Sequence, residues 1–240
     1  MEVDAFRRLF PVHYYERLSK LIRPMLDPRK KPEILLWAVA SSDGSALAKI
    51  GSATMLAAIK MEVMTPSVYS PSEGSIVVEF HMPPICSPVV RPGRPAEVAP
   101  ELSLIKGKAA WVAYLYINCL DADGALFNAA LLSAVAAFSH LDIPVVSLND
   151  EGRMVMVSKE LEGEKRKLLL KSIPFSLTCV LHKNYYILAD PTFEEESIME
   201  TFITVVLNSS AQLVSLYKPG GQRRKELQEI NEAISTMEID

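Results

Sequence analysis

The chain has 240 residues, of which 49% are apolar and 22% charged, and its formal net charge is −4. This composition is typical of a globular protein that buries a sizeable core, and it excludes a disordered chain. The net charge excludes the overall basic surface of many nucleic-acid-binding proteins, so any contact with RNA or DNA must come from local patches.

Cysteine usage and hydropathy indicate the compartment. The three cysteines, Cys86, Cys119 and Cys179, lie far apart in apolar surroundings, which fits neither a disulfide framework nor a zinc site. The N-terminus lacks the apolar core of a signal peptide, and the longest apolar run, residues 125–138, is too short to span a bilayer. We therefore expect a soluble intracellular protein with buried thiols.

The first elements are predicted to be a helical arm and a series of strands. Residues 5–22 carry apolar side chains at helical spacing. Strand-like runs follow at residues 34–40, 46–50, 54–63 and 75–82, and Ser41-Ser-Asp-Gly-Ser45 predicts a hairpin turn between the first two. Six of the sixteen prolines fall within residues 83–100, which excludes a central strand or a helix interior and places Arg91 and Arg94 on an exposed loop.

The most ordered stretch runs from Ala109 to His140. Trp111–Cys119 is apolar on both faces, as expected for a strand that is buried from both sides. Asp121-Ala-Asp-Gly124 turns the chain. Asn128–Phe138 is small and apolar nearly all round, which predicts a helix packed tightly between layers.

The second half repeats short strands. Residues 145–148 and 153–158 flank a turn, and residues 159–172 form a charged connector. Two hairpins are predicted, one from residues 175–182 and 185–189, the other from residues 202–207 and 212–217. The tail from Gln222 has apolar side chains at helical spacing.

Two acidic segments are candidates for chemistry. Asp121-x-Asp123-Gly124 resembles the start of a calcium loop but lacks the remaining ligands, so a turn with an aspartate as helix cap is favoured. Asp190-Pro-Thr-Phe-Glu-Glu-Glu196 has carboxylates that can hold Mg²⁺ or act as general acid and base. The same residues can instead cap a helix, because carboxylates favour a helix N-terminus, and this reading is preferred.

The remaining motifs argue against a cofactor or metal. His13, His81, His140 and His182 are scattered without metal-binding spacing, and the sequence has no phosphate-binding loop, dinucleotide fingerprint or nucleophile elbow. We predict no cofactor and no metal site. The basic clusters Lys165–Lys167 and Arg223–Lys225 are typical of a solvated surface, although either could contact phosphate.

Taken motif by motif, the chain resembles the RNase PH family, and within it the ring subunits of the RNA exosome. The resemblance covers most of the chain and is carried by several segments together: Tyr14-Tyr15, Ile22–Pro24, Ser42–Gly51, Thr54–Lys60, His81–Ser87, Gly107–Gly124, Asn128–Ala130, Ile173–Ser176, Asp190–Glu196 and Lys218–Gly221.

The resemblance implies an α+β fold, RNase PH-like (ribosomal protein S5 domain 2-like), with two βαβ-type halves. It implies an N-terminal arm at residues 1–30, a first half at 31–144, a second half at 145–221 and a C-terminal helix at 222–240. Family members carry a helix before the Gly107 strand, and Glu101-Leu-Ser-Leu-Ile105 is too short to hold it. The first half is therefore expected to lack one helix.

The resemblance also implies assembly into a ring with other RNase PH-like subunits and cap subunits around an RNA channel, without membrane contact, in the nucleus, nucleolus and cytoplasm. Active relatives bind phosphate through an arginine whose position, counted back from Leu120, holds Trp111. Asp190 and Glu196 match the paired carboxylates of active relatives. Acids without a phosphate-binding cation repel the attacking anion, so we expect a non-catalytic subunit with vestigial Asp190 and Glu196.

Arg91 and Arg94 are the expected RNA contacts, because the matching loop of relatives faces the channel. Two alternatives remain open. One is an active phosphate-dependent 3′-to-5′ exoribonuclease that uses Asp190 and Glu196. The other is a shortened variant that cannot join the ring.

Overall fold

The computed structural model describes residues 31–66, 74–83, 96–99, 103–105, 109–144, 146–148, 155–157, 165–182, 186–198 and 201–218. The predicted N-terminal arm, the C-terminal helix, and both Arg91 and Arg94 lie outside these residues. No helix among the described residues is long and apolar enough to cross a membrane.

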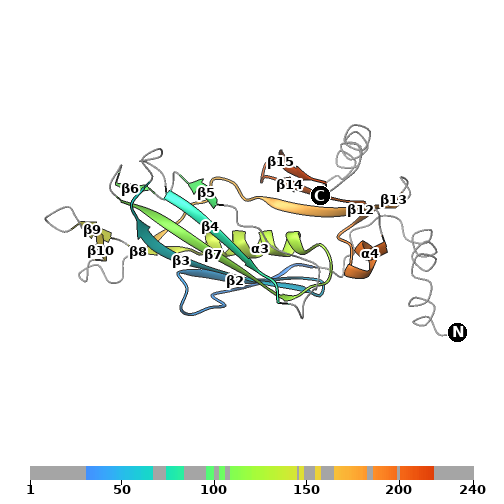
Figure 1. Cartoon of the computed structure of the whole chain (residues 1–240), viewed down its shortest axis with the longest axis horizontal. Coiled ribbons are helices and arrows are strands. Elements are labelled where there is room, and N and C mark those ends of the chain that lie inside the picture. Colours follow the sequence, from blue (N-terminus) through green and yellow to red (C-terminus); the bar gives the residue numbers. More distant parts are fainter. Residues whose placement is uncertain are drawn as a thin grey trace.

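A seven-stranded sheet forms the first half (Figure 1). Its strand order is β1-β2-β3-β7-β4-β5, with β6 paired to β7 beside this path. All pairs are antiparallel except β4 with β7. The strands are β1 (Glu33–Leu36), β2 (Gly44–Ile50), β3 (Ala53–Met64), β4 (Gly74–His81), β5 (Ala96–Ala99), β6 (Ser103–Ile105) and β7 (Ala109–Asp121).

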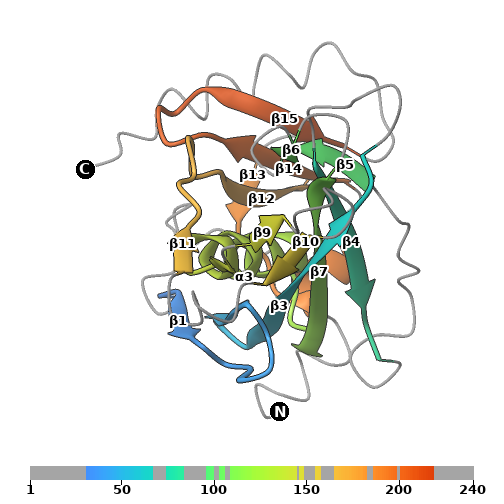
Figure 2. The ribbon, with the colours of Figure 1, turned by 90° about the vertical axis from the view of Figure 1, so that its left-hand side faces the viewer.

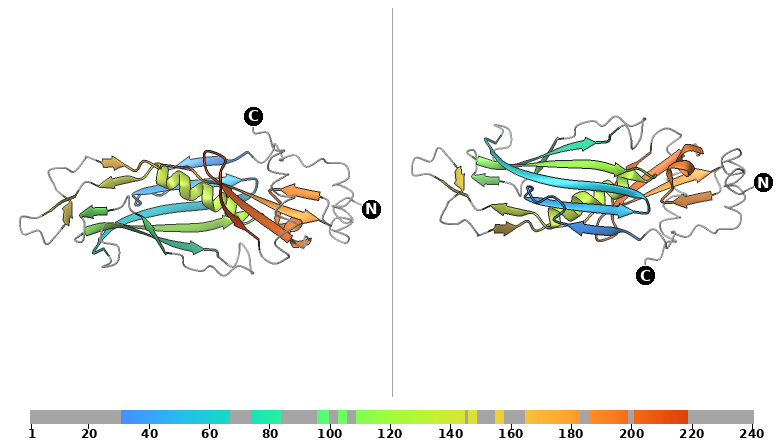
Figure 3. Two further views of the ribbon diagram at one scale, coloured as in Figure 1. Left: turned by 90° about the horizontal axis from the view of Figure 1, so that it is seen from above. Right: turned by 90° about the horizontal axis from the view of Figure 1, so that it is seen from below.

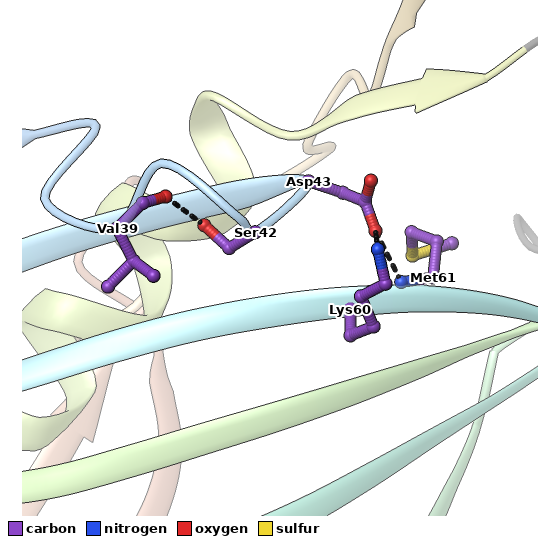
Figure 4. Close-up of polar contacts among 5 residues, drawn as sticks. All are labelled: Val39, Ser42, Asp43, Lys60 and Met61. Carbon is purple, nitrogen blue, oxygen red and sulfur yellow. Dashed lines mark hydrogen bonds and ion pairs between the residues drawn. The ribbon is translucent and has the colours of Figure 1, made fainter.

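The predicted first hairpin is present, but its first strand is shorter than expected. β1 ends at Leu36 because Trp37 adopts a left-handed backbone with φ of 58°. The turn is held onto the sheet by side chains (Figure 4). The Ser42 hydroxyl donates to the Val39 carbonyl at 2.7 Å, and the Asp43 carboxylate accepts from the Met61 N–H at 2.8 Å.

The second half contains a four-stranded antiparallel sheet in the order β13-β12-β14-β15. Its strands confirm both predicted hairpins: β12 (Phe175–His182) with β13 (Tyr186–Ala189), and β14 (Thr201–Leu207) with β15 (Leu213–Tyr217). Two short antiparallel pairs precede this sheet. They are β8 (Asp142–Pro144) with β11 (Lys165–Lys167), and β9 (Val146–Leu148) with β10 (Val155–Val157). The basic cluster Lys165–Lys167 is therefore a strand within the predicted connector.

Helix α3 (Leu126–Ser139) lies between the two sheets and packs against β2 and β3 on one side and β12 on the other (Figure 2). Small buried side chains line it nearly all round, among them Ala129, Ala130, Ser133 and Ala137. Gly44 allows the close approach of β2, since an added Cβ would lie 2.9 Å from the Ala137 carbonyl oxygen. The prediction of a small, apolar helix packed between layers is confirmed.

The expectation that the strand at Trp111–Cys119 is buried from both sides is only partly right. Strand β7 is buried on both faces at its start, where Trp111, Val112 and Ala113 are at most 5% exposed. Farther along, Tyr116 is 39% exposed and Leu120 is 51% exposed. Both point away from α3, because side chains alternate along a strand and the neighbouring Ile117 and Cys119 are in the core.

The fold is the α+β arrangement that the sequence implies, with helix α3 between two sheets. Between residues 83 and 109 the described residues form only strands β5 and β6. Most of the stretch where the resemblance implies a missing helix lies outside the described residues.

A candidate site where the two halves meet

The Asp-Gly turn that precedes α3 is pressed against the start of α4 (Phe193–Ile198). Gly124 has φ of +66°, and an added Cβ there would lie 2.2 Å from the Pro191 carbonyl oxygen and 2.8 Å from the Phe193 nitrogen. Pro191 is fully buried. This contact brings residues near 124 and near 192 together and so assembles the two acidic segments.

The two segments bond to each other reciprocally. The Ala125 N–H, at the start of α3, donates to Oε1 of Glu196 at 2.7 Å. In return, the Phe193 N–H, at the start of α4, donates to Oδ1 of Asp123 at 3.3 Å. We call this pair of contacts the reciprocal cap. Because free N–H groups and the positive helix dipole gather at a helix N-terminus, each carboxylate stabilises the helix of the other half.

The prediction that an aspartate of the Asp-Gly turn caps the following helix is wrong. Ala125 is the N-cap of α3, with φ of 44°, and it has no capping side chain. The consecutive left-handed residues Gly124 and Ala125 turn the chain so that Asp123 faces α4 instead.

Helix α4 has in addition a local capping box. The Thr192 hydroxyl accepts from the Glu195 N–H at 3.4 Å, and the Glu195 carboxylate accepts from the Thr192 N–H at 2.8 Å. This is the reciprocal pattern expected for a Thr followed three residues later by Glu. The preferred reading of residues 190–196, helix capping, is confirmed for Thr192.

A buried polar chain connects α3 to the second sheet. Asn128 is 7% exposed, and its carbonyl oxygen accepts from the Thr178 hydroxyl at 3.1 Å. The Thr178 and Thr204 hydroxyls are 3.0 Å apart. The Asn128 amide donates to Oδ1 of Asp190 at 3.5 Å, at the long end of the hydrogen-bond range. Each buried polar group thereby has a partner, as burial requires.

Cys179 follows Thr178 in β12 and so lies beside this network of hydrogen bonds. Burial, and to a lesser extent the negative charge of Asp190, together raise the pKa of its thiol from 9.0 to about 11. A thiol is nucleophilic only as a thiolate, so Cys179 is unreactive at neutral pH.

The structure brings Asp190 and Glu196 to the same place, next to the start of α3. Trp111 is not part of this place. It pairs with Val63 near the opposite end of β7, ten residues and so roughly 33 Å along the strand from Asp121. A side chain at position 111 therefore does not share a pocket with the two acids, and its identity carries no information about their chemistry.

Phe127 was missed in the sequence. It lies in the first turn of α3, two residues from the backbone N–H that Glu196 occupies, and it is 51% exposed. Its position could have been noticed in the sequence, because it follows an Asp-Gly turn that leads into a helix. The N-terminus of a helix is where an anion binds, and a cationic side chain there would support the binding, whereas Phe127 carries no charge. Among the described residues, no group of three or more His, Cys, Asp or Glu side chains is arranged to hold a metal ion.

Comparison with known proteins gives the family. The model of RNase PH, 3′ exoribonuclease family, domain 1, matches residues 33–144, and that of domain 2 matches residues 172–238. The exosome complex component Rrp42 of Methanopyrus kandleri is 30% identical over 205 residues, covering 78% of this chain and 74% of that protein. The exosome complex component rrp43 of Schizosaccharomyces pombe is 31% identical over 202 residues, covering 76% and 73%.

Solved structures agree. The Archaeoglobus fulgidus exosome with RNA bound to the active site contains a chain similar to this one, with a TM-score of 0.74, 25% identity, and coverage of 97% of this chain and 93% of that chain. Rice Rrp46 shares the fold, with a TM-score of 0.59, 14% identity, and coverage of 90% and 91%. With both domain models matched in order along the chain, this protein belongs to the RNase PH family of 3′ exoribonucleases.

Proposed function

We propose that this chain is a ring subunit of an exosome complex, and that it supports 3′-to-5′ RNA processing and degradation without cleaving RNA itself. Its relatives are named exosome complex components, and similar chains occur in archaeal exosome structures, one of them with RNA bound. Its partners would be other RNase PH-like subunits, cap subunits and RNA, in the nucleus or cytoplasm.

The observation that carries the absence of catalysis is the bond between Glu196 and the Ala125 N–H. Phosphorolysis needs inorganic phosphate bound beside the acids, and the natural anion-binding group there is the N-terminus of α3. In this chain a carboxylate of the protein already occupies that N–H, and the first turn of α3, Leu126–Ala129, contains no cationic residue. A second anion bound there would be repelled by Glu196.

A phosphorolysis assay tests this proposal. The pure chain is incubated with a single-stranded oligo-RNA and inorganic phosphate, beside a phosphorolytic member of the family as positive control. We expect no nucleoside diphosphate from this chain. Release of nucleoside diphosphates that is lost in Asp190→Asn would establish the alternative, an active exoribonuclease.

Ring membership is tested separately, by co-expression with the other RNase PH-like subunits of the same organism. We expect the chain to co-purify with them in a complex of defined mass. A chain that folds but stays alone would indicate the shortened variant that cannot assemble. In the assembled ring, replacing Arg91 and Arg94 by Ala should lower crosslinking to RNA, and unchanged crosslinking would remove both from the RNA path.

A further inference from the structure

The seven-stranded sheet has one face against α3 and a second face on the opposite side, which we call the open face. Seen from below, β2 and β3 lie in front of α3 (Figure 3, right). The apolar side chains of β2, β3 and β7 that are at least partly exposed on the open face are Leu47, Leu56, Ala58, Tyr114, Tyr116 and Leu120, whereas Val112 on the same face is buried.

This composition does not match that of a solvated face. An antiparallel sheet with one face in water normally alternates apolar and polar residues, whereas β7 is apolar on both sides for most of its length. Tyr116 and Leu120 are nevertheless 39% and 51% exposed. Tyr114 and Tyr116 stack, with ring centroids 6.5 Å apart and planes within 20°, and so form a rigid aromatic centre.

The charges around this centre favour a protein over RNA as the occupant. The exposed Lys49 and Lys60 are balanced by the exposed Glu62 and Glu79 on the same face, and Lys60 is already paired with Asp43 at 3.5 Å. An RNA-binding face needs an excess of positive charge to neutralise phosphates. A Tyr-rich apolar centre with a rim of both signs is instead the anatomy of a protein interface.

The size of the face fits the centre of an interface. Strands β2, β3, β7 and β4 lie side by side at about 4.8 Å spacing, and the two outer pairs extend over seven residues each, or roughly 23 Å. This gives roughly 440 Å², against about 800 Å² from each partner in a standard interface, so the open face can form the apolar centre of a contact but not the whole of it.

We infer that the open face is the surface by which this chain binds a neighbouring protein subunit of the ring, through an apolar contact centred on Tyr116. This inference rests on the proposed function. The occupant is a folded subunit that presents an apolar centre and a rim of mixed charge, because a face that carries both signs of charge is complementary to a surface that carries both signs.

The first test is assembly. The chain is co-expressed with the RNase PH-like subunits of its organism as wild type, as the double variant Tyr116→Asp/Leu120→Asp, and as the control Leu169→Asp, whose residue is 86% exposed and lies outside the face. Circular dichroism and thermal unfolding establish that each chain folds. We expect the double variant to associate at least about tenfold more weakly and the control to be unchanged. Wild-type assembly by a folded double variant would overturn the inference.

The second test needs no variant. Hydroxyl-radical labelling of Tyr116 is compared in the free wild-type chain and in the assembled complex, and we expect it to fall several-fold on assembly. Equal labelling in a formed complex would overturn this inference and leave the proposed function standing. Failure of the wild type to form any complex would overturn both. Protection of Tyr116 by oligo-RNA, or by self-association of the chain without the other subunits, would overturn the inference that a ring subunit binds this face.

Discussion

The two described helices start in different ways. Helix α4 is capped from within, because Thr192 and Glu195 of the same turn bond to each other's backbone N–H groups. Helix α3 is capped from outside, by Glu196, which is 71 residues away along the chain. Asp123, which is beside α3 in sequence, bonds instead to the start of α4.

The difference teaches where the two halves of the fold depend on each other. A local cap forms whenever its own helix forms, whereas the reciprocal cap exists only when the Asp-Gly turn and α4 are in contact. Damage to the reciprocal cap should therefore cost stability at the junction of the halves, and damage to the local cap should cost only the first turn of α4.

The largest effect is expected for Gly124→Ala. The new Cβ would meet the backbone of Pro191 and Thr192, and the residue would keep an unfavourable positive φ. We expect the free energy of unfolding, measured by urea denaturation, to fall by about 3 kcal/mol or more. The control Gly51→Ala, at φ of 60° in the β2–β3 turn, should lose about 1–2 kcal/mol. Equal losses for Gly124→Ala and Gly51→Ala would show that the backbone of α4 can move away from the new Cβ at little cost in free energy.

Next in size is Glu196→Ala, which removes the acceptor of the Ala125 N–H. We expect a loss of about 2 kcal/mol, because a partly buried N–H is left without its bond to a charged group. Glu196→Gln keeps an acceptor oxygen and should lose less than about 1 kcal/mol. A Gln variant as unstable as the Ala variant would contradict the hydrogen-bond explanation.

A smaller effect is expected for Thr192→Ala, which removes the hydroxyl of the local capping box. The free energy of unfolding should fall by about 1 kcal/mol, and Thr192→Ser should recover most of it because serine caps equally well. Combining Thr192→Ala with Glu196→Ala tests the comparison directly. The two losses should differ from simple addition, since both act on the six-residue helix α4.

The smallest effect at neutral pH belongs to Cys179, whose thiol has a pKa raised from 9.0 to about 11, by burial first and by Asp190 second. The folded state favours the neutral thiol, so this contribution to stability is complete below pH 9 and is lost as the pH rises toward 11. Urea midpoints of the wild type should fall more than those of Cys179→Ala over this range. If the urea midpoints of the wild type and of Cys179→Ala changed equally with pH, or if Cys179 of the folded chain were alkylated rapidly at pH 8, the raised pKa of Cys179 would be contradicted.

Much of the fold could be predicted because it depends on local patterns. The strands of both predicted hairpins and the small, apolar helix α3 follow from alternation, turn residues and composition over short windows. The predictions were wrong where a contact between residues far apart in the sequence determines the local structure. β1 stops at Trp37 because the backbone there turns left-handed, with the indole edge-on to the His140 ring at 6.4 Å.

The candidate site was predicted less well. Asp190 and Glu196 were chosen through their match to a family motif, and the structure does place them together. The expectation of a non-catalytic subunit rests in the sequence on Trp111, which lies near the opposite end of β7 and away from the two acids. The better argument, the occupied N–H at Ala125, requires knowing which carboxylate reaches it, and no spacing in the sequence contains that information.

The sequence by itself determined the family, the order of the elements and the local cap of α4, because each rests on residues that are close along the chain. Only the tertiary structure decided that Glu196 caps α3, that Asp123 serves α4, and that the second face of β7 is partly exposed. The physical reason is the same for all three. The partner of a hydrogen bond and the burial of a sheet face depend on which groups are close in space. For Glu196 and Asp123 the bonded groups belong to the other half of the fold, and for Tyr116 and Leu120 of β7 the face of the strand is partly exposed.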